Sequence, residues 1–186
     1  ETTQEAVDFF AMVREQDARA AEHLSVCFDT CHLRLQGEDL AASLSELEHN
    51  DIAVAKIQVS AALVCDNRDG CAAREVLTPY DEPVYLHQTR VFDGDTEIAR
   101  FADLGDALDA NPAGRWLVHF HVPLPFEGDG ALSSTADALT AEFFDLAFAQ
   151  CSHIEVETYT FDVLPGPKPS VNDSIIGEMQ WLLARV

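Results

Sequence analysis

The sequence has few basic residues and no long apolar run. Lysine and arginine together number 11 against 33 aspartates and glutamates, which gives a net charge of −22. The acids are spread along the chain, which indicates a solvated acidic exterior, and such a surface repels nucleic acid and anionic lipid. No apolar stretch approaches the ~20 residues of a membrane span. We therefore expect no nucleic-acid partner, no membrane insertion and a cytoplasmic location.

Several catalytic and redox motifs are also missing. The sequence has no Gly-rich phosphate loop, no Gly-x-Ser-x-Gly elbow, no His-Glu-x-x-His and no Cys-x-x-Cys pair. Nucleotide-binding, serine-hydrolase and zincin functions therefore have no support. The five cysteines are an odd number, and free thiols in a reducing compartment are the expectation. A Cys65–Cys71 bridge is the alternative.

Strand-like and helix-like patterns alternate along the chain. Strands are expected at residues 25–30, 54–60, 116–122 and 154–160. Helices are expected after the capping residues Thr2, Asp39, Ser134 and Ser170, and over about 96–109. Residues 61–92 are expected to form a long irregular segment with a short strand at 84–91.

This alternation indicates parallel βαβ units and an α/β fold. Four such units make half of a (β/α)₈ TIM barrel, in which catalytic groups lie at the C-terminal ends of the strands. A flavodoxin-like open sheet is the alternative, but its strands are apolar on both faces, whereas polar residues lie inside these strands. Because the chain begins with Glu1 and not Met, we expect it to be a piece of a longer protein. Half a barrel leaves open edges and should aggregate or dimerise when alone.

Potential metal ligands recur at the ends of the expected strands. Asp29 and His32 follow the first strand, and Glu157 lies in the fourth. A carboxylate, an imidazole and a second carboxylate suit a divalent transition metal such as Zn²⁺, Mn²⁺ or Fe²⁺. We therefore predict Asp29, His32 and Glu157 as metal ligands. The alternative is a buried Asp–His pair that only braces a loop.

Other polar residues alternate with apolar ones in the same strands. His119 and His121 share one strand face and are candidates for ligands or for acid/base catalysis; the alternative is one satisfied core histidine and one partly exposed. Lys56 is a further catalytic candidate, and Gln58 would orient a substrate. Glu155 is expected to pair with Lys56, because either charge would be costly to bury alone. His87, in the long insertion, would bind substrate or pack the loop.

At these residues the chain resembles a known superfamily. Phe28-Asp29-Thr30-Cys31-His32 and Val156-Glu157-Thr158 resemble the strand-end metal ligands of xylose isomerase-like barrels. A closer resemblance, to the metabolite traffic protein EboE family, covers nearly the whole chain. That family is longer, so the resemblance implies that residues 1–186 are the C-terminal half of a single barrel domain. The stretches that carry the resemblance are Glu1–Thr3, Cys27–His32, Lys56–Leu63, Glu82–Gln88, Val118–Pro123 and Ile154–Pro165.

The EboE resemblance implies a barrel protein encoded beside a prenyltransferase-type gene, in clusters tied to the movement of secondary metabolites. One hypothesis is a metal-dependent isomerase or hydrolase that acts on a small hydroxylated or prenylated metabolite. The other is a non-catalytic protein that binds the metabolite and hands it over, with a vestigial metal site and a membrane prenyltransferase-type partner. Gln58, where metal-dependent relatives place a histidine, favours the second hypothesis, and the intact set of Asp29, His32 and Glu157 favours the first.

Overall fold

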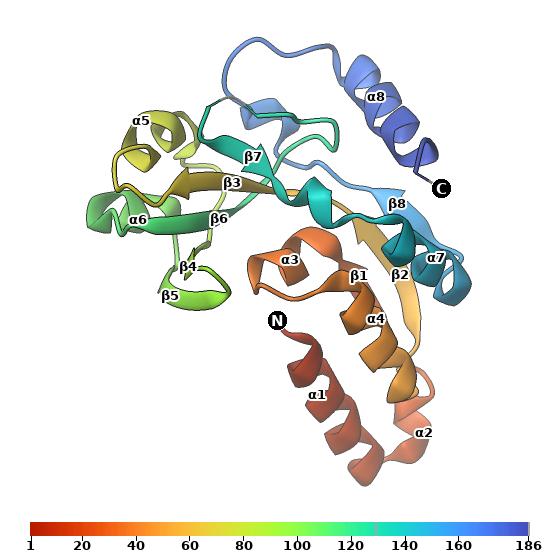
Figure 1. The fold of residues 1–186 in the computed structure, drawn as a ribbon. Coiled ribbons are helices and arrows are strands. Elements are labelled where there is room, and N and C mark those ends of the chain that lie inside the picture. Colours follow the sequence, from red (N-terminus) through yellow and green to blue (C-terminus); the bar gives the residue numbers. More distant parts are fainter. Residues whose placement is uncertain (129, 186) are drawn as a thin grey trace.

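The computed structural model describes residues 1–128 and 130–185 and shows two sheets flanked by helices (Figure 1). The α-helices are α1 (Thr3–Gln16), α2 (Ala18–Ala21), α3 (Thr30–Leu35), α4 (Leu40–His49), α5 (Ala73–Leu77), α6 (Leu104–Ala110), α7 (Ala141–Gln150) and α8 (Val171–Leu183). The strands are β1 (Val26–Asp29), β2 (Val54–Val59), β3 (Ala62–Asn67), β4 (Thr89–Asp93), β5 (Thr96–Phe101), β6 (Gly114–His121), β7 (Leu132–Ser134) and β8 (Ile154–Val156). The 3₁₀ helices are η1 (Thr78–Tyr80), η2 (Thr135–Ala138) and η3 (Phe161–Val163). No helix in the described ranges is long and apolar enough to cross a membrane.

The first sheet has three parallel strands in the order β1-β2-β8. Asp29 at the end of β1 pairs with Gln58 of β2, which in turn pairs with Glu155 of β8. Because side chains alternate along a strand, this register sets polar residues of neighbouring strands in one row. Phe28 is buried and its ring stacks on Phe143 of α7 at a centroid distance of 6.2 Å. The sheet is therefore apolar towards its helices and polar at its carboxyl edge.

The second sheet is antiparallel, with the strand order β5-β4-β6-β3-β7. In β6 the buried side chains of Trp116, Val118 and Phe120 belong to the main apolar core. Leu117 belongs to a separate cluster that includes Leu35 of α3. Side chains alternate along β6, so His119 and His121 lie on the face opposite to Trp116, Val118 and Phe120. This face, which also carries Leu117, is turned towards α3.

Two residues connect the two sheets. Strand β2 ends at Val59, and β3 begins at Ala62, with Ser60 and Ala61 between them. In Figure 1 the ribbon runs almost without a break from β2 into β3. Ala61 accepts a backbone hydrogen bond from Val122 at 3.0 Å, and Val59 accepts one from Glu157 at 3.1 Å. The ends of β6 and β8 therefore meet at this joint.

The prediction of half a TIM barrel is wrong. The described strands form one parallel and one antiparallel sheet, and they enclose no barrel. A parallel neighbour needs a crossover of a dozen or more residues, whereas only two residues separate β2 from β3. The predicted strand at 116–122 does form, but it pairs antiparallel with β3 and β4 and does not continue the parallel sheet.

Residues 61–101 account for most of the error in secondary structure. The stretch expected to be irregular contains β3 and β4, and the first part of the expected helix at 96–109 is the strand β5. Gly94, at a φ of +58°, lies in the turn between β4 and β5, where Asp93 pairs with Thr96. A two-residue turn with a positive φ favours a hairpin over a helix. The real helix, α6, is confined to Leu104–Ala110.

Most predicted helix caps are confirmed. The side chains of Thr2, Asp39 and Ser170 accept backbone hydrogen bonds at the starts of α1, α4 and α8. Ser134 instead caps η2, and Thr140 caps α7. The five cysteines are free, so the alternative of a Cys65–Cys71 bridge is wrong.

Gly114→Ala should destabilise the protein, because β6 and β4 approach too closely there for a side chain. A Cβ at Gly114, where φ is +153°, would lie 2.7 Å from Val91 and 2.8 Å from the carbonyl oxygen of Phe92. Overpacking of this kind costs about 1–3 kcal/mol. Urea denaturation of the two proteins measures the difference. Gly105→Ala is the matched control, since its Cβ would meet Asp81 no closer than 3.5 Å, and it should lose no stability.

Candidate metal site

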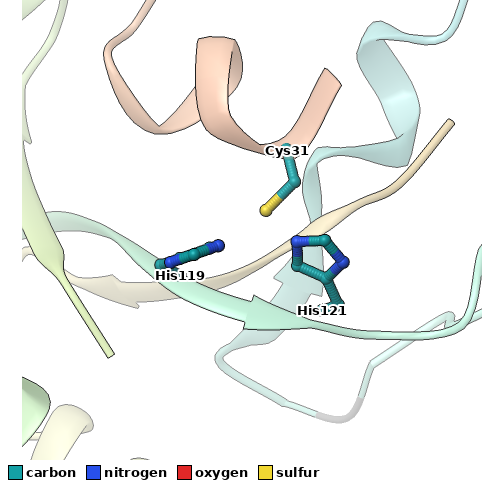
Figure 2. A group of neighbouring side chains, drawn as sticks. All are labelled: Cys31, His119 and His121. Atoms are coloured by element: carbon teal, nitrogen blue, oxygen red, sulfur yellow. The ribbon is translucent and has the colours of Figure 1, made fainter. Parts of the chain in front are cut away.

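The candidate site lies between the first turn of α3 and the face of β6 that is turned away from the core. Figure 2 shows Cys31 of α3 pointing to the space between the rings of His119 and His121. His32, the next residue of α3, has its ring centroid 4.2 Å from that of His119 and 6.4 Å from that of His121. The site therefore joins residues that are about 90 positions apart in the sequence.

Asp29 fixes the position of α3 over the second sheet. Its Oδ1 accepts hydrogen bonds from the backbone N–H groups of Cys31 (2.9 Å) and His32 (3.2 Å), and from Oγ of Ser60 (2.8 Å). One carboxylate oxygen thus caps α3 and ties it to the joint between the sheets. This is the bracing role that the sequence left open. All three donors bind Oδ1, so Oδ2 is left for another partner.

His121 is held as a neutral ring with a buried lone pair. Its Nδ1 lies 3.2 Å from the carbonyl oxygen of Glu157, which accepts a hydrogen bond from it. Burial lowers the pKa of His121 to about 4. A neutral ring that donates from Nδ1 carries its lone pair on Nε2. That Nε2 is buried and has no hydrogen-bond partner, which is the arrangement of a metal-binding histidine.

His119, two residues earlier in β6, lies in a similar environment. Burial, together with the neighbouring rings of His32 and His121, lowers its pKa to about 3. Its Nε2 is also buried without a partner. The prediction that His119 and His121 share a strand face is confirmed. His121 is fully buried and His119 is partly exposed, as the alternative of one core and one partly exposed histidine expects, but Nε2 of the core ring of His121 has no partner.

Two groups of three potential ligand atoms share His121. Asp29, His32 and His121 form one group, and the atoms they offer lie within 4.8 Å of one another. Cys31, His119 and His121 form the other group within the same limit. Oxygen and imidazole ligands suit Mn²⁺, Fe²⁺ and Zn²⁺, and thiolate with imidazole suits Zn²⁺. The donors present therefore fit a divalent transition-metal ion.

Glu157 lies beside the first group. Its Oε2 is 4.0 Å from Nδ1 of His121. Burial raises its pKa to about 7, and the charge of Asp29 and a hydrogen bond to Asp29 raise it as well. Two carboxyl groups this close share a proton or a cation. Of the three predicted ligands, Asp29 and His32 thus lie in one group with His121, and Glu157 lies next to that group rather than in it.

Lys56 and Gln58 belong to neither of the two ligand groups. The ammonium of Lys56 forms an ion pair with Glu155 at 2.7 Å, which confirms the expected pairing of these two residues. Gln58 accepts a hydrogen bond from Sγ of Cys27 at 3.1 Å. Both side chains therefore have protein partners in the parallel sheet. Gln58 still faces open space, as the cavity beside the site shows.

His87 lies outside the site. Its Nδ1 is 2.9 Å from the carbonyl oxygen of His119, and its Nε2 is 2.9 Å from the carboxylate of Glu82. The side chain is fully buried against the ring of Phe120 at a centroid distance of 4.9 Å. With both ring nitrogens occupied, His87 packs the loop and supports the backbone of β6. The geometry favours this alternative over substrate binding.

Two neighbours of the site were missed in the sequence. Strand alternation predicts side-chain directions only as far as Asp29. It therefore gives no position for Cys31, which lies in the helix that Asp29 caps. Tyr159, which follows β8, has its ring 4.5 Å from that of His121 and 5.0 Å from that of Tyr85. An Asp cap two residues before Cys31 is a signal that could have placed the thiol on the first turn of α3.

A cavity of about 390 Å³ opens beside the site. Asp29 and His32 line it together with Gln58, Cys27 and Phe28. This volume is at the small end of ligand pockets. The lining combines polar groups at the strand ends with apolar walls, so the cavity fits a small polar molecule that reaches the first ligand group from outside.

Comparisons with protein-family models, with curated proteins and with solved structures found no match.

In the metal-free protein, Glu157→Gln should alter how stability depends on pH. The raised pKa of Glu157 means that the folded state binds more protons than the unfolded state between about pH 4.5 and 7. Stability due to this group is thus present below pH 4.5 and is lost as the pH rises to 7. The groups around it are Asp29, His121, Glu155 and Lys56.

Urea denaturation in the presence of a chelator measures this effect between pH 4.5 and 8. The wild-type protein should lose stability over that range relative to Glu157→Gln, whose amide cannot ionise. Glu155→Gln is the control, because the pKa of Glu155 is lowered by its bond to Lys56, and it should not reproduce the flatter profile. Parallel curves for the wild type and Glu157→Gln would contradict the assignment.

Proposed function

We propose that the protein binds a divalent transition-metal ion with Asp29, His32 and His121, and uses it on a small polar metabolite. One observation carries this proposal: ligand atoms of Asp29, His32 and His121 lie within 4.8 Å of one another, and Nε2 of His121 is buried without a hydrogen-bond partner. A metal ion there would supply Lewis-acid polarisation of a substrate oxygen. Asp29 and His32 face the cavity, so substrate would approach from that side.

The sequence assigned His121 an acid/base role, but its geometry favours a ligand role. Its Nδ1 donates to the carbonyl oxygen of Glu157, which leaves the unpaired Nε2 as the ring nitrogen that can bind an ion. Glu157 is then the better candidate for proton transfer or for a fourth ligand, because its carboxyl group lies next to Asp29 and has a pKa of about 7. Gln58 lines the cavity and is placed to orient a bound metabolite.

The reaction type that we propose is isomerisation or hydrolysis within a metabolite traffic pathway. The resemblance to the EboE family supports the pathway role, and the carboxylate–imidazole ligand set supports metal-assisted chemistry. A non-catalytic handover protein, working with a membrane prenyltransferase-type enzyme, is the second candidate. Gln58 favours it, since the amide already holds the Cys27 thiol and is a weaker metal ligand than an imidazole.

Substitution of the ligands should abolish binding of Mn²⁺ or Fe²⁺ at micromolar concentrations. Loss of a residue that only supports a ligand lowers metal affinity 10–100-fold, so Asp29→Asn and His121→Ala should lower it at least ~100-fold. Calorimetric titration of the purified protein after chelation measures this. His23→Ala is the control, because His23 is exposed in the loop after α2, and its affinity should equal that of the wild type. A wild-type protein that takes up none of Mn²⁺, Fe²⁺ and Zn²⁺ would overturn the proposal.

Complementation separates the two candidate functions. In cells that lack the native gene, an enzyme should lose metabolite export with Asp29→Asn, because the ion is needed for turnover. A handover protein should retain export with the same variant, since the shape and polarity of the cavity are unchanged. Immunoblotting for equal protein levels controls for unfolding.

A further inference from the structure

Cys31 takes no part in the function proposed above, yet its thiol faces two histidine rings. It is the second residue of α3 and is fully buried. Burial raises the pKa of this thiol well above its usual value, so without a metal ion it is a neutral S–H group. Cys65 is equally buried but belongs to the main apolar core. The two thiols therefore occupy chemically different surroundings.

The histidines opposite Cys31 supply an independent sign of a missing partner. Nε2 of His119 and Nε2 of His121 are both buried and unpaired. Buried polar atoms nearly always have a partner, so each such exception requires an explanation. Figure 2 shows Sγ of Cys31 directed towards the space between these two rings. An ion in that space would bind the lone pairs of both rings and the thiolate.

We propose that Cys31, His119 and His121 form a second coordination position, selective for Zn²⁺, that is an alternative to the position made by Asp29, His32 and His121. This inference rests on the proposed function, because it states which metal each half of the site selects. Nε2 of His121 has one lone pair and can bind one ion at a time. The protein would therefore hold a harder ion such as Mn²⁺ beside Asp29, or Zn²⁺ beside Cys31, but not both with full coordination.

The distances are compatible with zinc after a small closure. Zn–S bonds of about 2.3 Å and Zn–N bonds of about 2.0 Å place tetrahedral ligand atoms roughly 3.5 Å apart. The three ligand atoms now lie within 4.8 Å of one another, so small side-chain rotations suffice. Three protein ligands leave a fourth position open, as in catalytic zinc sites.

Binding at this position would release a proton. The S–H bond of Cys31 breaks, the proton passes to the buffer, and the thiolate sulfur donates its electron pair to the ion. No oxidant or reductant is required. The neighbouring carboxylates of Asp29 and Glu157 raise the pKa of the free thiol, and the same negative charge favours a cation in their vicinity.

Cobalt reports directly on the sulfur ligand, because thiolate bound to Co²⁺ gives an intense near-ultraviolet charge-transfer band that carboxylate and imidazole do not give. The experiment uses protein in which the exposed Cys27 and Cys71 are replaced by serine, kept under a phosphine reductant. Co²⁺ titration should produce the band with a stoichiometry of one ion per chain. Cys31→Ser should abolish it, whereas Cys65→Ser, the matched buried control, should leave it unchanged.

The position made by Asp29, His32 and His121 is tested by Mn²⁺ uptake. This uptake is measured as the loss of the electron paramagnetic resonance signal of free Mn²⁺. Cys31→Ser should retain Mn²⁺ binding, Asp29→Asn should lose it but keep the cobalt band, and His121→Ala should lose both. One equivalent of Zn²⁺ should release the bound Mn²⁺ from the parent protein, because the two positions share His121. A cobalt band that survives Cys31→Ser, no band in the parent protein, or simultaneous binding of both ions would overturn the inference. If Cys31→Ser takes up none of Mn²⁺, Fe²⁺ and Zn²⁺ while the parent protein gives the cobalt band, the function proposed for Asp29 is overturned and the thiolate position stands.

Discussion

The three hydrogen bonds accepted by Oδ1 of Asp29 determine the geometry of the site. They end β1, begin α3 and tie both to Ser60, the first residue of the joint between the sheets. Because a six-residue helix is far too short to be stable alone, α3 depends on this cap and on its packing against β6. The cap therefore decides where Cys31 and His32 lie relative to the histidines of β6. Without it, the ligands from the two sheets would have no fixed separation.

The joint between β2 and β3 adds a second constraint. Ser60 is bonded to Thr30 as well as to Asp29: its N–H donates to Oγ1 of Thr30 at 2.8 Å, and Oγ1 of Thr30 donates to its carbonyl oxygen at 2.7 Å. These bonds are buried, so each group would be costly to leave unpaired. Rigid strands and a locked helix start preorganise the ligands, which is what a metal site requires. The candidate ligands come from β1, α3 and β6, so an ion held by them would cross-link the two sheets.

Local patterns predicted the elements more successfully than their pairing. The strands that carry Asp29, Gln58 and the two histidines of β6 follow from alternation, and three helix starts follow from their caps. The prediction of a barrel failed because segments far apart in the sequence decide whether a strand pairs parallel or antiparallel. In addition, residues 61–101 are rich in turn-forming residues, so the hairpin and the strand β3 in this segment were not predicted. The candidate site was nevertheless found, since ligands at strand ends converge in either arrangement. Cys31 was missed because its side chain is placed by helical geometry, which strand alternation does not describe.

The buried histidines differ in whether their ring nitrogens have hydrogen-bond partners. His87 is buried as deeply as His121, yet both of its ring nitrogens lie 2.9 Å from acceptors, so this fold can satisfy a structural histidine completely. The Nε2 atoms of His119 and His121 have no such partner, and each buried unpaired polar group costs about 1–3 kcal/mol. Two of them remove a substantial part of the 5–15 kcal/mol by which a domain is usually stable. A structural role alone would be served better by apolar residues of the same shape, which carry no such penalty. A metal ion bound by both nitrogens would give each of them a partner and remove this cost. The free energy gained in this way would stabilise only the metal-loaded protein.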